Sequence, residues 1–187
     1  MAQKIVFLLL SVLLLLTGSA CAVEGESTVS SAVVPPGQDS SKILVAYFSA
    51  TGTTRPLAEY AAEHLGADIY EITPQEPYTE EDLAYYTDCR ADREQNDPSA
   101  RPTIFGSVED MGQYDVVFFG YPIWHGQAPR IISTFLENYD FAGKTIVPFC
   151  TSHSSGIGSS ADNLYDLAAS AEWLEGSGLA PAPAEMR

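Results

Sequence analysis

The chain has 187 residues, with 25 acidic side chains against 9 Lys and Arg, so its formal net charge at pH 7 is −16. Such an acidic chain repels nucleic acids and anionic lipid surfaces, and it favours basic protein partners or simply keeps the protein soluble. The three cysteines have no Cys-x-x-Cys spacing, so neither a metal site nor a redox dithiol is expected. Cys89 and Cys150 could still pair with each other in an exported chain.

The first 21 residues have the layout of a secretory signal. Lys4 precedes an almost wholly apolar run at residues 5–16, which is short for a membrane span, and small residues then lead to Cys21. This cysteine resembles the lipidation site of bacterial lipoproteins, although Gly18 stands where that motif usually has Leu, and Ala20 to Ala22 also fits ordinary cleavage. We expect export, with Cys21 lipidated and anchoring the protein to the outer face of the bacterial cell membrane. Residues 22–41 predict a flexible tether, and residues 42–187 predict one domain.

The segment from Lys42 to Leu65 predicts a strand, a tight turn and a helix. The apolar run at 43–48 is typical of a buried parallel strand, and Leu57, Tyr60, Ala61 and Leu65 have helical spacing after Pro56. The turn at 49–54 offers four hydroxyl side chains, one Gly and the free N–H groups of a helix start. Such a turn attracts a phosphate, although it is neither a Walker loop nor a dinucleotide turn. A Ser/Thr-rich helix cap without a ligand is the alternative.

Strands and helices alternate along the rest of the domain. Strands are expected at 67–72, 115–120, 144–150 and 172–174, and helices at 79–86, 129–139 and 160–169, with a long polar connection at 73–102. This alternation predicts an α/β fold with a parallel sheet covered on both faces. The irregular loops 49–54, 121–129 and 151–158 each follow a strand, so they should converge at the edge where such sheets bind ligands.

These three loops and their strands resemble the FMN-contacting segments of the flavodoxin-like family. The segments are ILVAYFSATGTT at 43–54, VVFFGYPIWHGQAP at 116–129 and IVPFCTSHSSGIG at 146–158, and the similarity is greatest to bacterial flavodoxins with Pro-Ile-Trp after the third strand. The resemblance implies a flavodoxin-like three-layer sandwich with a five-stranded parallel sheet in the order 2-1-3-4-5. Thr53 replaces the usual Asn of the family's phosphate turn. Residues 183–187 look like the first turn of the last helix, so the helix appears truncated in this sequence.

The resemblance implies an FMN site built from all three loops. The phosphate would be held by Ser49, Thr51, Gly52, Thr53 and Thr54. The ring would lie against Pro122, Ile123 and Trp124, and its other edge would be lined by Thr151, Ser152 and Gly156. His125 lies in the same loop and is a candidate for contact with the ring edge. Gly126 can turn its peptide toward the flavin at little steric cost. No catalytic residue is expected from the sequence.

Three functions follow from this site. The first is an exported FMN protein that transfers electrons to or from a basic redox protein. The second is an FMN-dependent oxidoreductase that passes electrons from NAD(P)H to a quinone. In that case Tyr85, Tyr86, Arg90, Arg93 and Arg101 in the polar connection could cover the substrate. The third is a binding module that keeps the fold without the cofactor, for which Thr53 is the only indication.

Overall fold

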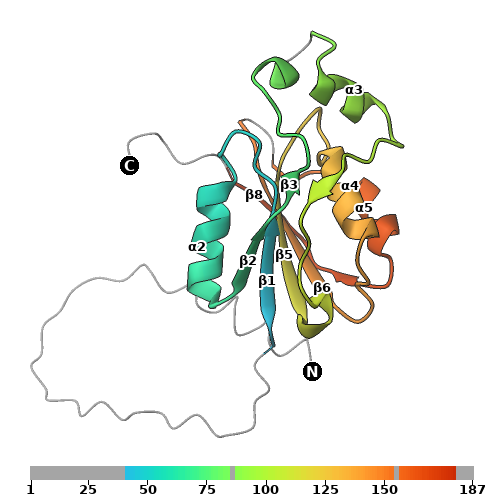
Figure 1. Ribbon diagram of the computed structural model, residues 1–187. Coiled ribbons are helices and arrows are strands. Elements are labelled where there is room, and N and C mark those ends of the chain that lie inside the picture. Colours follow the sequence, from blue (N-terminus) through green and yellow to red (C-terminus); the bar gives the residue numbers. More distant parts are fainter. Residues whose placement is uncertain (1–40, 85–86, 154–155, 180–187) are drawn as a thin grey trace, which may run out of the picture. The chain divides into compact units, whose positions relative to one another are not determined.

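The protein folds around a parallel sheet whose strand order is that expected from the sequence (Figure 1). The computed structural model describes residues 41–84, 87–153 and 156–179. The strands are β1 (Ile43–Tyr47), β2 (Asp68–Glu71), β5 (Val116–Pro122), β6 (Thr145–Thr151), β7 (Glu172–Trp173) and β8 (Ser177–Leu179). Their order is β2-β1-β5-β6-β7, which is the order 2-1-3-4-5 of the major strands. The predicted signal, the tether and the start of a last helix at 183–187 lie outside the described residues.

The fifth position in the sheet is shared by two short strands. β7 pairs with the start of β6 and β8 pairs with its end, whereas the sequence predicted one strand at 172–174. Between the two strands the chain passes very close to β6, since a Cβ added to Gly176 would lie 2.4 Å from the carbonyl oxygen of Pro148. The chain can take this path only because residue 176 has no side chain.

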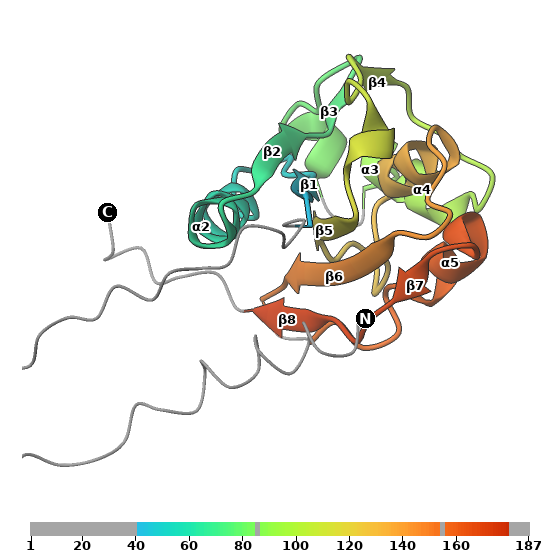
Figure 2. The same ribbon diagram turned by 90° about the horizontal axis from the view of Figure 1, so that it is seen from below.

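Helices cover the two faces of the sheet (Figure 2). On one face, α2 (Arg55–Leu65) packs Ala58 and Ala62 against Val45 and Tyr47. On the other face, α4 (Arg130–Glu137) buries four large apolar residues, and the short α5 (Asp162–Tyr165) lies beside it. The large side chains of α4 in the core are Ile131, Ile132, Phe135 and Leu136. The central strands are buried on both sides, which explains their continuous apolar sequences.

Helix boundaries follow the sequence prediction for α2 and differ elsewhere. The predicted start at Arg55 and end at Leu65 are confirmed, and α4 is shorter at both ends than the predicted range of 129–139. The helix predicted at 160–169 is in fact α5 followed by a 3₁₀ turn, η4 (Asp166–Ala168). None of the described helices is both long enough and apolar enough to span a membrane.

The polar connection forms a small cap above the carboxyl ends of the strands (Figure 1). We use the word cap for its described residues, 75–84 and 87–101. The base of the cap is closed by β3 (Thr73–Pro74) and β4 (Ile104–Phe105), which pair antiparallel. The helix predicted at 79–86 is wrong within its described residues, 79–84, because these form only a 3₁₀ turn, η2 (Glu81–Leu83), and Ala84 is extended. A second helix, α3 (Arg90–Asn96), was not predicted, since its sequence Arg-Ala-Asp-Arg-Glu-Gln-Asn has no apolar stripe.

Candidate functional site

The first loop presents hydroxyl groups at the start of α2. The Ser49 Oγ accepts hydrogen bonds from the backbone N–H groups of Thr54 at 3.0 Å and Arg55 at 3.3 Å, so it provides a partner for the N–H of the first helical residue. The hydroxyls of Thr51 and Thr53 lie 2.9 Å apart on the exposed side of the loop. Gly52 sits between them with φ +79°, in the left-handed region that favours glycine. These groups form an exposed polar cradle beside the positive end of the α2 dipole.

Thr151, at the end of β6, ties the three loops together. Its hydroxyl lies 2.9 Å from that of Thr54, and both residues are buried. Its carbonyl oxygen accepts a 3.0 Å hydrogen bond from the N–H of Ile123 in the second loop. The predicted convergence of the loops is therefore confirmed. The Thr54 hydroxyl faces Thr151 inside the protein, so it is turned away from a ligand in the cradle.

The second loop makes a tight turn after β5 ends at Pro122. Trp124 and Gln127 exchange backbone hydrogen bonds of 2.9 Å in both directions. The two residues between them, His125 and Gly126, have φ values of +50° and +76°. A positive φ is uncommon for a residue with a side chain, so the conformation of His125 needs support from its surroundings.

The indole ring of Trp124 is partly buried among other aromatic side chains. Phe48 and Tyr78 both meet it edge to face, with ring centroids 5.5 Å and 5.3 Å away. Phe48 follows β1 directly, whereas Tyr78 belongs to the cap. Phe48 and Tyr78 thus fix the position of the Trp124 ring, and Tyr78 is the contribution of the cap.

The predicted residues of the third loop lie at the end of β6 and beyond. Thr151 is buried, Ser152 is half-buried and Gly156 is exposed. His153 is exposed as well, and the loop is described apart from residues 154 and 155.

A hollow of about 140 Å³ lies between the loops and the cap. Its lining consists of Thr51, Trp124 and His125 from the loops and Leu83, Cys89, Ala91 and Asp92 from the cap. Pockets for drug-sized ligands usually measure about 300 Å³ or more. A flat tricyclic ring does not fit inside this hollow, whereas the exposed cradle of the first loop is open.

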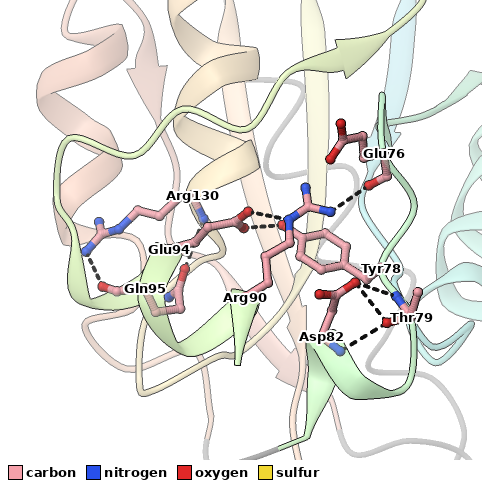
Figure 3. A network of polar contacts seen from close by, with 8 residues as sticks. All are labelled: Glu76, Tyr78, Thr79, Asp82, Arg90, Glu94, Gln95 and Arg130. Carbon is pink, nitrogen blue, oxygen red and sulfur yellow. Dashed lines mark hydrogen bonds and ion pairs between the residues drawn. The ribbon is translucent and has the colours of Figure 1, made fainter. Parts of the chain in front are cut away.

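The arginines of the cap are engaged in internal contacts, and Figure 3 shows those of Arg90. Arg90 donates to Glu94 at 2.8 Å and to the carbonyl of Glu76 at 2.9 Å, and its guanidinium lies 4.4 Å from the centre of the Tyr78 ring. Arg101 forms two 2.7 Å hydrogen bonds with Glu137, and Arg93 donates to the carbonyl of Asp88. These side chains hold the cap together and join it to α4. The substrate-covering role that the sequence suggested for them stays a prediction, and Tyr85 and Tyr86 lie outside the described residues.

Tyr78 and Glu94 extend this network toward Trp124. The Tyr78 hydroxyl donates to the carboxylate of Glu94. Burial, and then this hydrogen bond, raise the pKa of Tyr78 well above its usual value, so the hydroxyl stays protonated. The sequence had singled out neither residue, because their roles depend on partners from other parts of the chain.

The two cysteines that the sequence left as a potential pair are both free and buried. Burial raises the pKa of the Cys150 thiol to about 11, so it is not a reactive thiolate at neutral pH.

The sheet order, the helices on both faces and the three joined loops define a flavodoxin-like α/β protein. The family model for flavodoxin matches residues 42–186, and the chain belongs to this family. A search of curated proteins gave no match.

Solved structures support the assignment. A candidate flavoprotein from Bacteroides eggerthii is 51% identical, with a TM-score of 0.72, and the match covers 75% of this chain and 89% of that one. One from Bacteroides uniformis is 42% identical, with a TM-score of 0.73 and coverages of 78% and 94%. A Lactobacillus acidophilus flavoprotein in complex with FMN shares the fold at 23% identity, with a TM-score of 0.59 and coverages of 75% and 93%.

Proposed function

We propose that the protein binds FMN at the edge where the three loops meet. The observation that carries this proposal is the polar cradle of the first loop, which is joined through Thr151 to both of the other loops. The phosphate would lie at Ser49 to Thr54, and the ring at Pro122 to Gly126, with its other edge at Thr151, Ser152 and Gly156. Membership of the flavodoxin family and the FMN-bound Lactobacillus structure support this cofactor. Bound FMN would supply the chemistry, since it takes up and releases one or two electrons.

The phosphate would be held mainly by neutral groups. Arg55 is the cation at the start of α2, but its guanidinium makes hydrogen bonds of 2.7 Å and 2.9 Å to the carboxylate of Glu71. Hydroxyls, backbone N–H groups and the helix dipole remain for the anion. We therefore expect FMN affinity to depend only weakly on salt, in contrast to a site built on free arginines.

Among the three candidate functions, we propose electron transfer rather than reduction of a quinone by NAD(P)H. Every Lys and Arg within 41–84, 87–153 and 156–179 has at least one internal partner, and four of them pair with a carboxylate, which disfavours these cations as the site for the phosphates of a nicotinamide nucleotide. The partners are Gln113 and Asp68 for Lys42, Glu71 for Arg55, Glu94 for Arg90, Asp88 for Arg93, Glu137 for Arg101, Gln95 for Arg130 and Tyr114 for Lys144. The net charge of −16 would steer a basic redox protein toward this one.

Titration with FMN and with riboflavin tests the proposed cofactor. The purified protein should show the absorption bands of bound flavin. In the titrations FMN should bind more tightly than riboflavin, because riboflavin lacks the phosphate. A colourless protein that ignores added FMN would instead support the cofactor-free binding module.

Reductive titration and salt dependence test the proposed role. A carrier should take up electrons in two separate one-electron steps and exchange them with a basic partner at a rate that falls steeply with salt. Gly126→Val should bring the two one-electron potentials closer together, because valine opposes rotation of the peptide at this position. Rapid turnover of NADH or NADPH with a quinone would establish the oxidoreductase function.

We also propose that the protein is exported and anchored through Cys21. The proposal rests on the sequence of residues 1–21, which lie outside the described residues. Cys21→Ser should move the protein from the membrane fraction to the soluble exported fraction, because the attached acyl chains are lost. Recovery of the unaltered protein in the cytoplasm would rule out export, and unchanged membrane association of the variant would indicate an uncleaved anchor.

A further inference from the structure

Helix α3 of the cap turns a polar face toward the second loop. Asp92 and Gln95 lie three residues apart, on the same side of the helix, and each is only 5% exposed. Arg93 and Asn96, on the other side, are exposed. Burying a carboxylate and an amide is costly unless both are hydrogen-bonded. The hydrogen-bond partners of Asp92 and Gln95 therefore identify the segment that α3 supports.

Gln95 holds both ends of the turn in the second loop. Its Nε2 donates to the carbonyl oxygen of Trp124 at 3.1 Å and to that of Ala128 at 3.3 Å. Its Oε1 accepts from the backbone N–H of Arg130 at 3.0 Å, at the start of α4. The Arg130 side chain returns a 2.9 Å hydrogen bond to the Gln95 carbonyl (Figure 3). A single amide thus connects α3 to the turn and to the helix that follows it.

Asp92 holds the middle of the same turn. One carboxylate oxygen lies 2.8 Å from Nε2 of His125, and the other accepts from the N–H of Thr87 at 3.2 Å. Burial alone would raise the pKa of Asp92, but hydrogen bonds from His125, Cys89 and Thr87 outweigh it and lower the pKa. The carboxylate is therefore charged at neutral pH. It supports His125, whose φ of +50° is unfavourable without such a contact.

We propose that α3 preorganises the FMN site, with Asp92 and Gln95 as positioning residues that hold the turn from Trp124 to Ala128 in its binding conformation. This inference rests on the proposed binding of FMN. When a binding-competent conformation is only partly populated, the apparent affinity falls by that fraction. Loosening the turn should therefore weaken FMN binding even though neither side chain belongs to the three loops.

Gln95→Glu is the sharpest variant, because it keeps the size of the side chain and an acceptor for the Arg130 N–H. At pH 8 the carboxylate cannot donate to the carbonyls of Trp124 and Ala128. Asp92→Asn is the second variant: the two oxygens of Asp92 serve two different donors, so an amide must turn its NH₂ toward one of them. Asn96→Gln is the matched control, since Asn96 is exposed on the same helix and the change keeps an uncharged amide side chain.

The experiment uses full-length protein carrying Trp173→Phe, which leaves Trp124 as the only tryptophan. Near-ultraviolet circular dichroism and emission of Trp124 report the turn without FMN, thermal unfolding reports folding, and fluorescence titration gives the FMN affinity. We expect Gln95→Glu to weaken FMN by about ten-fold or more and Asp92→Asn by at least about three-fold, with altered Trp124 signals and an unaltered control.

Unchanged FMN affinity and unchanged Trp124 signals in a folded Gln95→Glu protein would overturn the inference, and so would equal weakening of FMN binding by Asn96→Gln. If Gln95→Glu does not fold, the FMN affinity and the Trp124 signals of Asp92→Asn test the inference instead. If the parent protein does not bind FMN at all, the proposed function fails. The Trp124 signals of the cofactor-free variants would then still show whether α3 holds the turn.

Discussion

The hydroxyls of Thr54 and Thr151 form a buried polar pair between two loops that are far apart in the sequence. They lie 2.9 Å apart, and neither residue has appreciable exposure. Such a pair is costly to break on one side, because the remaining hydroxyl loses its partner while staying out of water. Replacing both hydroxyls with methyl groups leaves no orphaned group.

Thr54→Val should therefore destabilise the protein by about 1–3 kcal/mol, and adding Thr151→Val should recover part of that loss. Urea unfolding of both single variants and the double variant measures this coupling. Thr53→Val is the control, because the hydrogen bond of the Thr53 hydroxyl lies on the exposed side of the loop. The free energy of unfolding should change little in this variant. Additive losses in the double variant would contradict a direct interaction.

Gly52 tests the phosphate cradle. Its φ is +79°, and apart from its chain neighbours no atom of the described residues lies within 4 Å of an added Cβ, so the cost of a side chain comes from the backbone conformation and from crowding of a ligand. Gly52→Val should cost about 1–2 kcal/mol in stability and weaken FMN far more than riboflavin. Calorimetric titration with both ligands measures the difference. An equal loss for FMN and riboflavin would place the phosphate elsewhere.

At the scale of elements, the contact between β5 and β6 depends on a glycine. A Cβ added to Gly120 in β5 would lie 2.3 Å from the ring of Phe149 in β6, far closer than real contacts allow. Gly120 pairs directly with Phe149, so the small residue makes room for the large one in the adjacent strand. The packing of β5 against β6 fixes the relative positions of the strand ends at which the second and third loops begin.

Gly120→Ala should destabilise the protein by about 1–3 kcal/mol through overpacking. Phe149→Leu combined with Gly120→Ala should be more stable than additivity predicts, because the smaller side chain relieves the clash. Chemical unfolding of the parent protein, the two single variants and the double variant gives the four free energies of a double-mutant cycle. If Gly120→Ala is as stable as the parent protein, the ring of Phe149 moves aside freely and the close packing does not limit this position.

At the scale of the whole molecule, buried tyrosines make the fold sensitive to alkaline pH. Burial, and then the negative charge of Glu71, raises the pKa of Tyr47 to about 12. Burial, and then a hydrogen bond to Asp68, raises the pKa of Tyr114 to about 12. In the unfolded chain both hydroxyls lose their protons near pH 10, while the folded protein keeps them. The unfolded state therefore binds fewer protons above pH 10, and it becomes relatively more favourable.

Stability should be constant with respect to these two groups below pH 10 and should fall as the pH rises from 10 to 12. Urea unfolding at a series of pH values, followed by circular dichroism, measures the slope. Tyr114→Phe should reduce the slope above pH 10, because one titrating group is removed. A slope that does not change in this variant would show that other groups dominate alkaline unfolding.

The sequence by itself determined the alternation of strands and helices, the convergence of the loops and the helix from Arg55 to Leu65, whereas the strand order was predicted only from the resemblance to the flavodoxin-like family. These features depend on local properties: apolar runs form buried strands, and turn residues such as Gly52 mark where strands end. Parallel strands also place their carboxyl ends on one edge of the sheet, so the positions of the three loops followed from the order of elements.

Only the tertiary structure revealed the cap and the role of α3. The buried face of α3 is polar, so hydrophobic periodicity gave no sign of it, and Asp92 and Gln95 find their partners about 30 residues further along the chain. The pairing of Arg101 with Glu137 was likewise not evident from the sequence, because the two residues lie 36 positions apart. Hydrogen bonds and ion pairs between distant residues depend on the folded geometry, which a pattern of residue types along one chain does not contain.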